Sequence, residues 1–306
     1  MSRQRDGQVI WHKGEFKNPE DATVNVLTHS LHYGSAVFEG TRVYETPKGP
    51  AVFRLDDHIN RLFYSADSLG MDLPSNKSDI RDITLDLVRR NGFQSCYLRH
   101  LAYYGYGNLR VMPADDVPIE MAIACWPWGT YLSDAPIDIN ISSYIRIHPK
   151  STVCDAKIAG HYVNCILSGL KIKGTHYKES LFLDDDDNVC EVGSANFFIV
   201  KDGKIYTPPL GTILAGITRN TLIEVARKLG YEVFEQHIRV DDILNADEAF
   251  LSGTAAEVTF VGTIDDKQIG TPDQNPVALK LREAYMAIVE GHDPEFEHYL
   301  TYVNEE

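Results

Sequence analysis

The sequence predicts a mixed α/β (α+β) protein of two domains, and three observations support this. The chain has 306 residues, about the length of two ordinary domains. Strand-like and helix-like segments interleave without a regular strand–helix–strand rhythm, which indicates a mixed class. The stretch 125–131 contains two tryptophans, a proline and a glycine, and is typical of a linker. We therefore expect one domain over 1–126, a linker over 127–136 and a second domain over 137–306.

The first half is strand-rich over 9–52 and then turns helical. Apolar residues at helical spacing predict the helices, and Gly70 ends the first of them. The expected elements are strands at 24–26 and 41–44 on either side of a glycine-containing segment, helices at 54–70 and 80–90, and a strand at 95–104.

The second half repeats this mixture. A threonine at the start, an apolar face and a terminal glycine predict the helix over 218–230. The expected elements are a strand at 137–147, a helix at 158–170, strands at 181–183 and 196–200 around an acidic turn, and the helix at 218–230.

Composition restricts the class of partner. Lys plus Arg is 29 and Asp plus Glu is 44, which gives a net charge of −15. Such a surface repels phosphate backbones and anionic lipid, so we expect neither nucleic-acid nor membrane binding. No signal peptide or bilayer-spanning run is apparent. Five cysteines without a C-x-x-C pair favour reduced thiols and a cytoplasmic protein.

Two patterns raise the question of metal binding, and neither predicts it. His29 and His32 form H-x-x-H without an accompanying Cys or carboxylate cluster. The acidic run 184–187 would need glycine at its sixth position and glutamate at its twelfth to bind calcium, but Val189 and Ala195 stand there. We expect a solvated hairpin turn and no metal site.

Lys157 is the residue that most directly indicates chemistry. It lies between Ala156 and Ile158, and a lysine in such a small, apolar setting either reaches solvent or is held for a reason. A desolvated lysine loses proton affinity and becomes a nucleophile for carbonyl groups. On an ideal helix Tyr162 would point about 140° away from Lys157. The two side chains can meet only if Lys157 precedes the helix and the chain turns at Gly160.

The segment around Lys157 resembles the lysine segment of the class IV pyridoxal-phosphate aminotransferases, and most closely that of the branched-chain amino acid aminotransferases. Other motifs match in order and spacing, and the likeness covers about residues 9 to 270. The matching segments are Leu31–Gly34, Val37–Gly40, Tyr97–Arg99, Ala156–Tyr162, Gly216–Arg219 and Ser252–Glu257. The resemblance implies fold type IV, with a smaller N-terminal α/β domain and a larger C-terminal pseudo-barrel domain that binds pyridoxal 5'-phosphate.

The resemblance also implies the roles of cofactor-binding residues. Lys157 would form the Schiff base and move the proton between Cα and C4′. Glu191 would pair with the pyridine nitrogen, which favours the protonated ring. Tyr162 would bind the phenolate oxygen. The phosphate would be held at a helix start, where N–H groups and the helix dipole favour an anion. The implied phosphate-binding residues are Arg61, Ile217, Thr218 and Thr254, and Ser194, Ala195 and Asn196 are implied near the cofactor.

The implied substrates are L-leucine, L-isoleucine, L-valine and 2-oxoglutarate, bound as amino acids and 2-oxo acids in a homodimer or higher homo-oligomer with a shared active site. Tyr97 and Arg99 lie two apart on a strand and so share one face. Arg99 would reach the second carboxylate of glutamate. The other implied substrate-binding residues are Tyr33, Phe38, Gly40, Arg110, Val111, Trp128, Tyr131 and Ala255, with Val111 lent by the neighbouring subunit.

Three departures from the branched-chain pattern concern substrate rather than cofactor. His100 follows Arg99 where these enzymes usually carry proline, and Ala195 stands where a glutamate commonly precedes Asn196. Arg110 places a bulky cation beside Val111. A D-amino acid or (R)-amine transaminase or an aminodeoxychorismate lyase on the same fold is the alternative. A non-catalytic binding protein is the more remote one.

Overall fold

The computed structural model describes residues 8–129, 132, 135–271 and 276–304. The chain divides into two compact units, which we describe separately. The first unit comprises Met1–Gly129, Ala156–Gly160 and Ile288–Glu306, and the second comprises Thr130–Asp155 and His161–Ala287. The division after Gly129 falls inside the expected linker. The segments 156–160 and 288–306 group with the first unit, although the sequence placed them in the second domain.

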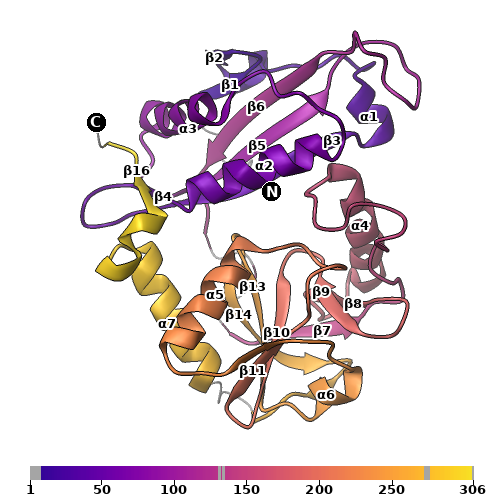
Figure 1. Ribbon diagram of the computed structural model, residues 1–306, viewed down its shortest axis with the longest axis vertical. Helices are drawn as coiled ribbons and strands as arrows, with labels where there is room; N and C mark the ends of the chain where they lie inside the picture. The colour runs from indigo at the N-terminus through magenta and orange to yellow at the C-terminus, as the bar shows by residue number, and fades with distance from the viewer. Residues whose placement is uncertain (1–7, 130–131, 133–134, 272–275, 305–306) are drawn as a thin grey trace. The chain divides into compact units, whose positions relative to one another are not determined.

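The first unit is built on a seven-stranded antiparallel sheet in the order β16-β4-β3-β5-β6-β1-β2 (Figure 1). Its strands are β1 (Ile10–His12), β2 (Glu15–Lys17), β3 (Ala36–Tyr44), β4 (Ala51–Phe53), β5 (Cys96–Tyr104), β6 (Ile119–Trp126) and β16 (Leu300–Tyr302). Its helices are η1 (Pro19–Asp21), α1 (His29–Tyr33), α2 (Leu55–Asp67), α3 (Lys77–Asn91) and η3 (Pro294–Tyr299).

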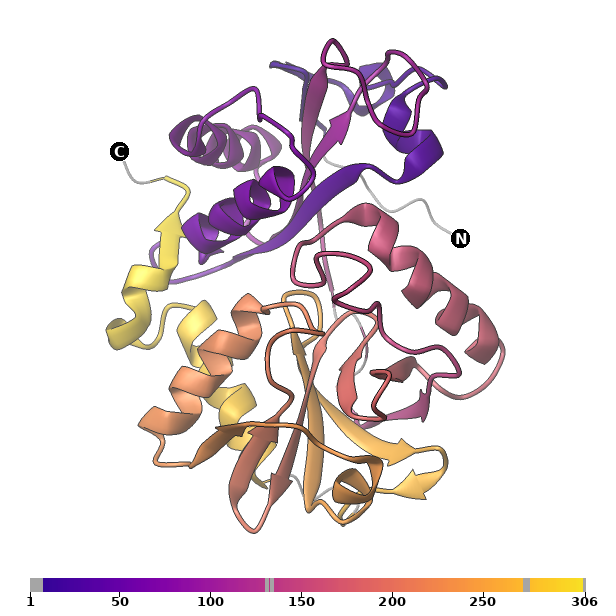
Figure 2. The same cartoon turned by 45° about the vertical axis from the view of Figure 1, so that its right-hand side comes forward.

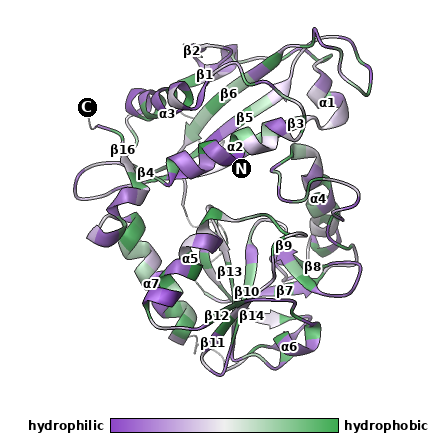
Figure 3. Cartoon of the chain, in the orientation of Figure 1, coloured by the Kyte–Doolittle hydropathy of each residue, from purple (hydrophilic) through white to green (hydrophobic). Residues whose placement is uncertain are grey.

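The register of β3 against β5 assigns side chains to the two faces of this sheet. Glu39 pairs with His100, and Gly40 pairs with Arg99. Successive side chains of a strand point to opposite faces, so Glu39 and His100 share one face while Arg99 lies on the other. Helices α2 and α3 cover the face of Glu39 and His100, where they bury the apolar core of the unit. In Figure 3, hydrophobic residues dominate β6, and hydrophobic and hydrophilic residues alternate along α2.

The second unit contains a nine-stranded sheet that closes on itself. The strands β10, β13, β14, β7, β8 and β9 follow one another by pairing, and β9 pairs back onto β10. The barrel-like ring has a core of aliphatic and aromatic side chains. The strands are β7 (Ile137–Ile141), β8 (Glu179–Leu183), β9 (Val189–Val192), β10 (Asn196–Lys201), β11 (Lys204–Thr207), β12 (Val233–Glu235), β13 (Glu248–Gly253), β14 (Glu257–Ile264) and β15 (Lys267–Gln268).

Helices pack around this ring. Helix α4 packs on β8, and α5 packs on β13 and β12 (Figure 2). The helices are α4 (Tyr162–Ile172), α5 (Ile217–Lys228) and α6 (Val240–Leu244), with η2 (Ala159–His161) and α7 (Pro276–Val289) crossing the boundary between the units. In the described part of the chain, no helix combines the length and apolar character that crossing a bilayer requires.

Most predicted elements are confirmed, including the helices at 54–70, 80–90 and 218–230 and the strand at 95–104. The strand expected at 24–26 is wrong, because the Asn25 side chain accepts a hydrogen bond from the Leu27 amide at 2.8 Å and closes a turn instead. Strand β3 begins at Ala36, five residues before the prediction. The helix predicted from Ile158 begins at Tyr162, because Ile158 forms an isolated bridge with Val37.

Candidate active site

The first unit holds Lys157 through its main chain. The Lys157 amide donates to the Ser65 hydroxyl of α2 at 2.9 Å, and its carbonyl accepts from the Phe38 amide of β3 at 3.1 Å. Ile158 continues this contact as the bridge to Val37. The lysine is therefore attached to both the sheet and the helix of this unit, which fixes the origin of its side chain.

A close approach of two glycines shapes the turn after Lys157. The Gly160 amide donates to the Gly34 carbonyl at 3.2 Å, and Gly34 has a φ of +65°. A Cβ atom on Gly34 would lie 3.0 Å from the Gly160 Cα, which is too close for an unstrained side chain. Because α4 begins at Tyr162, Lys157 precedes the helix, as the sequence required if the two side chains were to cooperate.

The Lys157 amine lies in a desolvated environment. Its Nζ atom is 4.8 Å from the centroid of the Phe38 ring. Burial lowers the pKa of Lys157 to about 8, with Arg61 and Arg99 lowering it further against the opposing effect of Glu39 and Tyr97. A substantial fraction of the amine is thus neutral near pH 8, which is the form that attacks carbonyl groups.

A buried carboxylate lies among these groups. Glu39 is fully buried and accepts from Nε of Arg61 at 2.6 Å, from Nη2 of Arg61 at 2.9 Å and from Nδ1 of His58 at 2.8 Å. Burial opposes ionisation of Glu39, but Arg61 and His58 outweigh it and hold the pKa of that carboxyl well below its usual range. Burial also lowers the pKa of His58. A neutral His58 therefore donates from Nδ1 to an ionised Glu39.

His100 lies beside Glu39 on the neighbouring strand. The Thr84 hydroxyl donates to the Ile80 carbonyl at 2.6 Å, so it accepts from Nε2 of His100 at 2.9 Å. Burial lowers the pKa of His100 to about 4. This residue, unusual for the branched-chain pattern, is therefore a neutral core histidine that links β5 to α3.

The opposite face of the sheet carries aromatic residues around Arg99. The Arg99 guanidinium carbon lies 4.8 Å from the Phe38 ring centroid and 5.5 Å from that of Tyr97. Trp128 stacks on Tyr97 with centroids 4.7 Å apart. A Cβ atom at position 40 would overlap the Tyr97 hydroxyl, so only Gly40 permits this position of the tyrosine. The structure thus brings together Phe38, Gly40, Tyr97, Arg99 and Trp128.

Tyr33 and Arg110, two further substrate candidates of this unit, contact His29. Its ring is 4.7 Å from that of Tyr33, and its Nε2 is 2.8 Å from the Arg110 carbonyl oxygen. Arg110 is exposed and Val111 is 78% exposed. Tyr131 lies outside the described residues.

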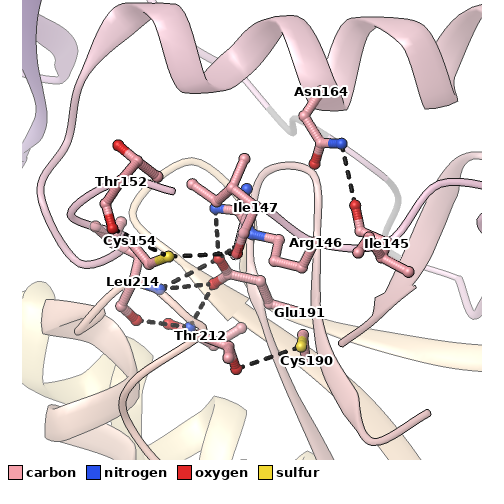
Figure 4. Close-up of polar contacts among 11 residues, drawn as sticks. Ile145, Arg146, Ile147, Thr152, Cys154, Asn164, Cys190, Glu191, Thr212 and Leu214 are labelled. Atoms are coloured by element: carbon pink, nitrogen blue, oxygen red, sulfur yellow. Dashed lines mark hydrogen bonds and ion pairs between the residues drawn. The ribbon is translucent and has the colours of Figure 1, made fainter. Parts of the chain in front are cut away.

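In the second unit, donors converge on Glu191 of β9 (Figure 4). Oε1 accepts from Nε of Arg146 at 2.9 Å, and Oε2 accepts from Nδ2 of Asn196 at 2.9 Å. The Leu214 amide lies 3.2 Å from both oxygens. Glu191 is only 4% exposed. It is a fixed, paired carboxylate rather than a surface glutamate after the acidic turn.

The start of α5 is suited to binding an anion. Its N-cap residue Gly216 contributes no side-chain hydrogen bond, and Ile217 and Thr218 follow as buried residues. A Cβ atom at position 216 would overlap Oδ1 of Asn196, so this glycine allows close approach of the chain. The first N–H groups of a helix lack intrahelical partners and favour a negative ligand.

Five further candidates occupy the turns near β10 and β13 and the start of α4. Ser194 is exposed, and its hydroxyl donates to Oε1 of Glu179 at 2.6 Å, whereas Ala195 is buried. Thr254 and Ala255 are half-buried in the turn between β13 and β14. Tyr162, also half-buried, is the first residue of α4.

The acidic run after β8 stabilises its own turn. Oδ1 of Asp184 accepts from the Asp186 and Asn188 amides at 3.0 and 2.8 Å. Within the described ranges, no group of three or more His, Cys, Asp or Glu side chains is arranged to hold a metal ion.

Sequence reasoning missed Ser65, His58 and Arg146. His58 offered a signal, because it lies three residues before Arg61 on a predicted helix and so on the same face. Ser65 and Arg146 offered none, since their partners Lys157 and Glu191 are distant in sequence.

The first unit holds a desolvated lysine beside the buried Arg61–Glu39 pair, and the second unit holds a helix start that favours an anion. Each feature is suited to an enzyme that works on carbonyl compounds with a phosphorylated cofactor. The chain belongs to the amino-transferase class IV family, whose model matches residues 36–264.

Curated relatives and solved structures agree with this assignment. The chain is 40% identical over 291 residues to a branched-chain-amino-acid aminotransferase of Pseudomonas aeruginosa, covering 94% of each chain. It is 36% identical over 306 residues to that of Escherichia coli K12, covering 98% of this chain and 99% of the relative. The solved structure of the branched-chain amino acid aminotransferase from Thermobaculum terrenum, in its pyridoxal-phosphate holo-form, is similar with a TM-score of 0.92, at 32% identity over 99% of this chain and 100% of that chain.

Proposed function

We propose that this chain is a pyridoxal-phosphate-dependent transaminase that moves the amino group between L-leucine, L-isoleucine or L-valine and 2-oxoglutarate. The observation that carries the proposal is the desolvated amine of Lys157, whose pKa is lowered to about 8, held in the segment that characterises the family. Relatives named as branched-chain aminotransferases, matched over nearly the whole chain, support the substrate class.

The residues present fit pyridoxal phosphate. The Ser252 hydroxyl is fully buried without a hydrogen-bond partner among the described residues. Ser252 lies on β13, directly opposite Asn196 of β10. The α5 start has no side-chain cap, and Glu191 is buried and paired. These features suit a ligand with a dianionic phosphate and a ring nitrogen.

When bound, the cofactor supplies a carbonyl carbon that captures amines and a ring that accepts the electron pair released when a C–H bond is broken. Lys157 is the nucleophile toward that carbonyl, because its amine is desolvated and partly neutral near pH 8. The same Nζ atom would serve as general base and acid for the substrate Cα proton, since a pKa of about 8 lies near neutral pH.

Other residues bind and orient the cofactor. Glu191 would hold the ring nitrogen, and Tyr162 the phenolate oxygen. Ile217, Thr218 and Thr254 would bind the phosphate together with Arg61. Because Glu39 accepts hydrogen bonds from Nε and Nη2 of Arg61, the plane of the guanidinium is fixed before phosphate binds. We place Ser194, Ala195 and Asn196 beside the cofactor, with Asn196 acting through Glu191.

Substrate binding is assigned to the aromatic face around Arg99. Phe38, Gly40, Tyr97 and Trp128 would accept a branched side chain, and Arg99 would bind the second carboxylate of glutamate. Ala255 would contribute its main-chain N–H to the α-carboxylate. Tyr33, Tyr131 and Val111 would complete the pocket, with Arg110 at its mouth.

We also propose a homodimer in the cytoplasm. Helix α4 exposes four large apolar side chains, Val163, Ile166, Leu167 and Leu170, and a second copy of the chain would cover such a face. All five cysteines are thiols rather than disulfides, which is consistent with a reducing compartment. Sedimentation of the wild type and of the Ile166→Glu variant tests the dimer, since a charge on this face should weaken association.

A donor panel tests the reaction. With 2-oxoglutarate as acceptor, L-leucine and L-valine should be deaminated much faster than D-alanine or (R)-1-phenylethylamine. A preference for the D-amino acid or the amine would instead favour the related transaminases. Absence of any visible absorption band in protein purified with pyridoxal phosphate would favour a non-catalytic binding protein.

A further inference from the structure

Arg146 and Glu191 form a buried ion pair in the second unit (Figure 4). Oε1 of Glu191 accepts from Nε of Arg146 at 2.9 Å and lies 2.8 Å from Nη2. Oε2 receives the Asn196 amide at 2.9 Å. Two guanidinium nitrogens of Arg146 therefore contact Oε1 of the carboxylate.

The pair is too costly to be explained by stability alone. Arg146 is 8% exposed and Glu191 is 4% exposed, and desolvating two charges offsets most of their mutual attraction. The Arg146 amide donates to the Leu183 carbonyl at 2.7 Å, and its guanidinium carbon lies 6.0 Å from the Phe182 ring centroid, so the arginine is held from both ends. Its Nη1 atom is buried without a hydrogen-bond partner in the described structure.

The buried thiols near Arg146 and Glu191 carry no charge that competes with this ion pair. Burial raises the pKa of Cys154, and it raises that of Cys190 to about 12, so both thiols are neutral at physiological pH. Asp155 and Asp184 act on these thiols at longer range. Burial by itself would lower the pKa of Arg146, but Glu191, Cys165 and Tyr162 raise it above its ordinary value.

We propose that Arg146 is a positioning residue for amino-group transfer: it binds Oε1 of Glu191 and, with Asn196 on Oε2, orients this carboxylate toward the ring nitrogen of pyridoxal phosphate. The proposal rests on the proposed function. A carboxylate already balanced by a guanidinium binds a ring proton less tightly than an isolated one. Arg146 thereby sets how firmly Glu191 holds that proton.

The first test measures charge rather than activity. The visible absorption band of the bound cofactor changes with pH as a nearby proton is lost, and removing a cation favours the protonated form. Arg146→Met should raise the midpoint of this change by about one pH unit, the lower end of the effect of one close charge. Arg146→Lys keeps the charge and should stay close to wild type.

A matched control separates this effect from lost packing. Arg219 is 1% exposed and donates to Glu235 and to the Pro208 carbonyl, and it has no bond to Glu191. Arg219→Met should lower thermal stability without moving the midpoint. An equal shift in the Arg219 and Arg146 variants, or no shift in Arg146→Met, would overturn the proposal.

The second test asks whether Arg146 acts through Glu191. In a single-turnover half-reaction with L-leucine, Arg146→Met should lose about tenfold to a hundredfold, the scale of a charged hydrogen bond. Added to Glu191→Gln, it should cause little further loss, because the group that it orients is gone. Fully multiplying losses would contradict the proposal.

Two features keep these tests decisive. The double variant removes both charges together and so avoids an unpaired buried carboxylate if Arg146→Met alone folds poorly. Arg146→Lys should fold with a nearly unchanged midpoint but react more slowly than wild type, because one ammonium cannot make the two-nitrogen contact. If the wild type shows no visible band, the proposed function fails, whatever the Arg146 variants do.

Discussion

Arg61 and Glu39 form a buried ion pair in which two guanidinium nitrogens each bond a different carboxylate oxygen, at 2.6 and 2.9 Å. The arginine comes from α2 and the glutamate from β3, and His58 adds a third donor from the same helix. This arrangement presents Arg61 in one orientation, which is what a fixed phosphate-binding cation requires.

Glu39→Gln should therefore weaken binding of pyridoxal phosphate to the apoprotein by about tenfold or more, because the amide cannot accept both N–H groups of Arg61. Fluorescence titration of the apoprotein measures the affinity. Asp56→Asn is the control, since Asp56 lies on the same helix as Arg61 but pairs with Arg81 at the surface. Equal affinities for Glu39→Gln and wild type would separate Glu39 from phosphate binding.

The pKa of Lys157 predicts a pH-dependent stability of the apoprotein. Its folded pKa of about 8 lies below the ordinary value of 10.5, so the unfolded chain binds more protons between these two values. Burying the ammonium thus destabilises the fold fully below pH 8, and this effect vanishes as pH rises toward 10.5. Lys157→Met should melt at a higher temperature than wild type at pH 7, with the gap closing by pH 10.5. A gap independent of pH would show that the amine is not desolvated.

His100 should make the fold sensitive to acid. Its folded pKa of about 4 lies below the ordinary 6.5, so stability is lost as pH falls through this range. His100→Gln can still donate to Thr84 but cannot take up the proton. As pH falls from 6.5 to 4, the melting temperature of His100→Gln should rise relative to that of wild type. The melting temperature of the control variant His292→Gln, at an exposed position, should not rise relative to wild type. Parallel acid profiles for His100→Gln and wild type would contradict this.

Arg99 should determine how well the protein uses glutamate and 2-oxoglutarate, the two dicarboxylate substrates. In the proposed reaction leucine and glutamate would share one pocket, and only glutamate would need a cation for its second carboxylate. Arg99→Ala should weaken use of glutamate and 2-oxoglutarate by about tenfold to a hundredfold and leave leucine nearly unchanged. Arg110→Ala should do less, since Arg110 is exposed and its carbonyl oxygen, rather than its side chain, contacts His29. The reverse pattern in steady-state kinetics would move the substrate assignment toward the amine or D-amino acid relatives.

The sequence predicted those parts of the fold that rest on local periodicity. The helix of Arg61 and the strand of Arg99 have regular apolar patterns, and the structure confirms both. The strand at 24–26 failed because the side chain of Asn25 bonds the main chain and closes a turn, which a hydrophobic pattern does not reveal.

The candidate site was predictable only where motifs identify residues. Lys157 and Glu191 follow from the family likeness, but the groups that hold them do not. Ser65 is 92 residues from Lys157 and Arg146 is 45 from Glu191, and no spacing rule connects such distant positions. Buried polar partners of this kind are determined by tertiary packing.

Reduction of the pyridoxal-phosphate-loaded protein with borohydride, followed by peptide mapping, tests the central claim most directly. In the proposed reaction the desolvated Lys157 amine is the nucleophile, so the reduced cofactor should be found on the peptide that contains Lys157, and Lys157→Ala should carry no label. Label on Lys150, Lys171 or any other lysine would contradict the account.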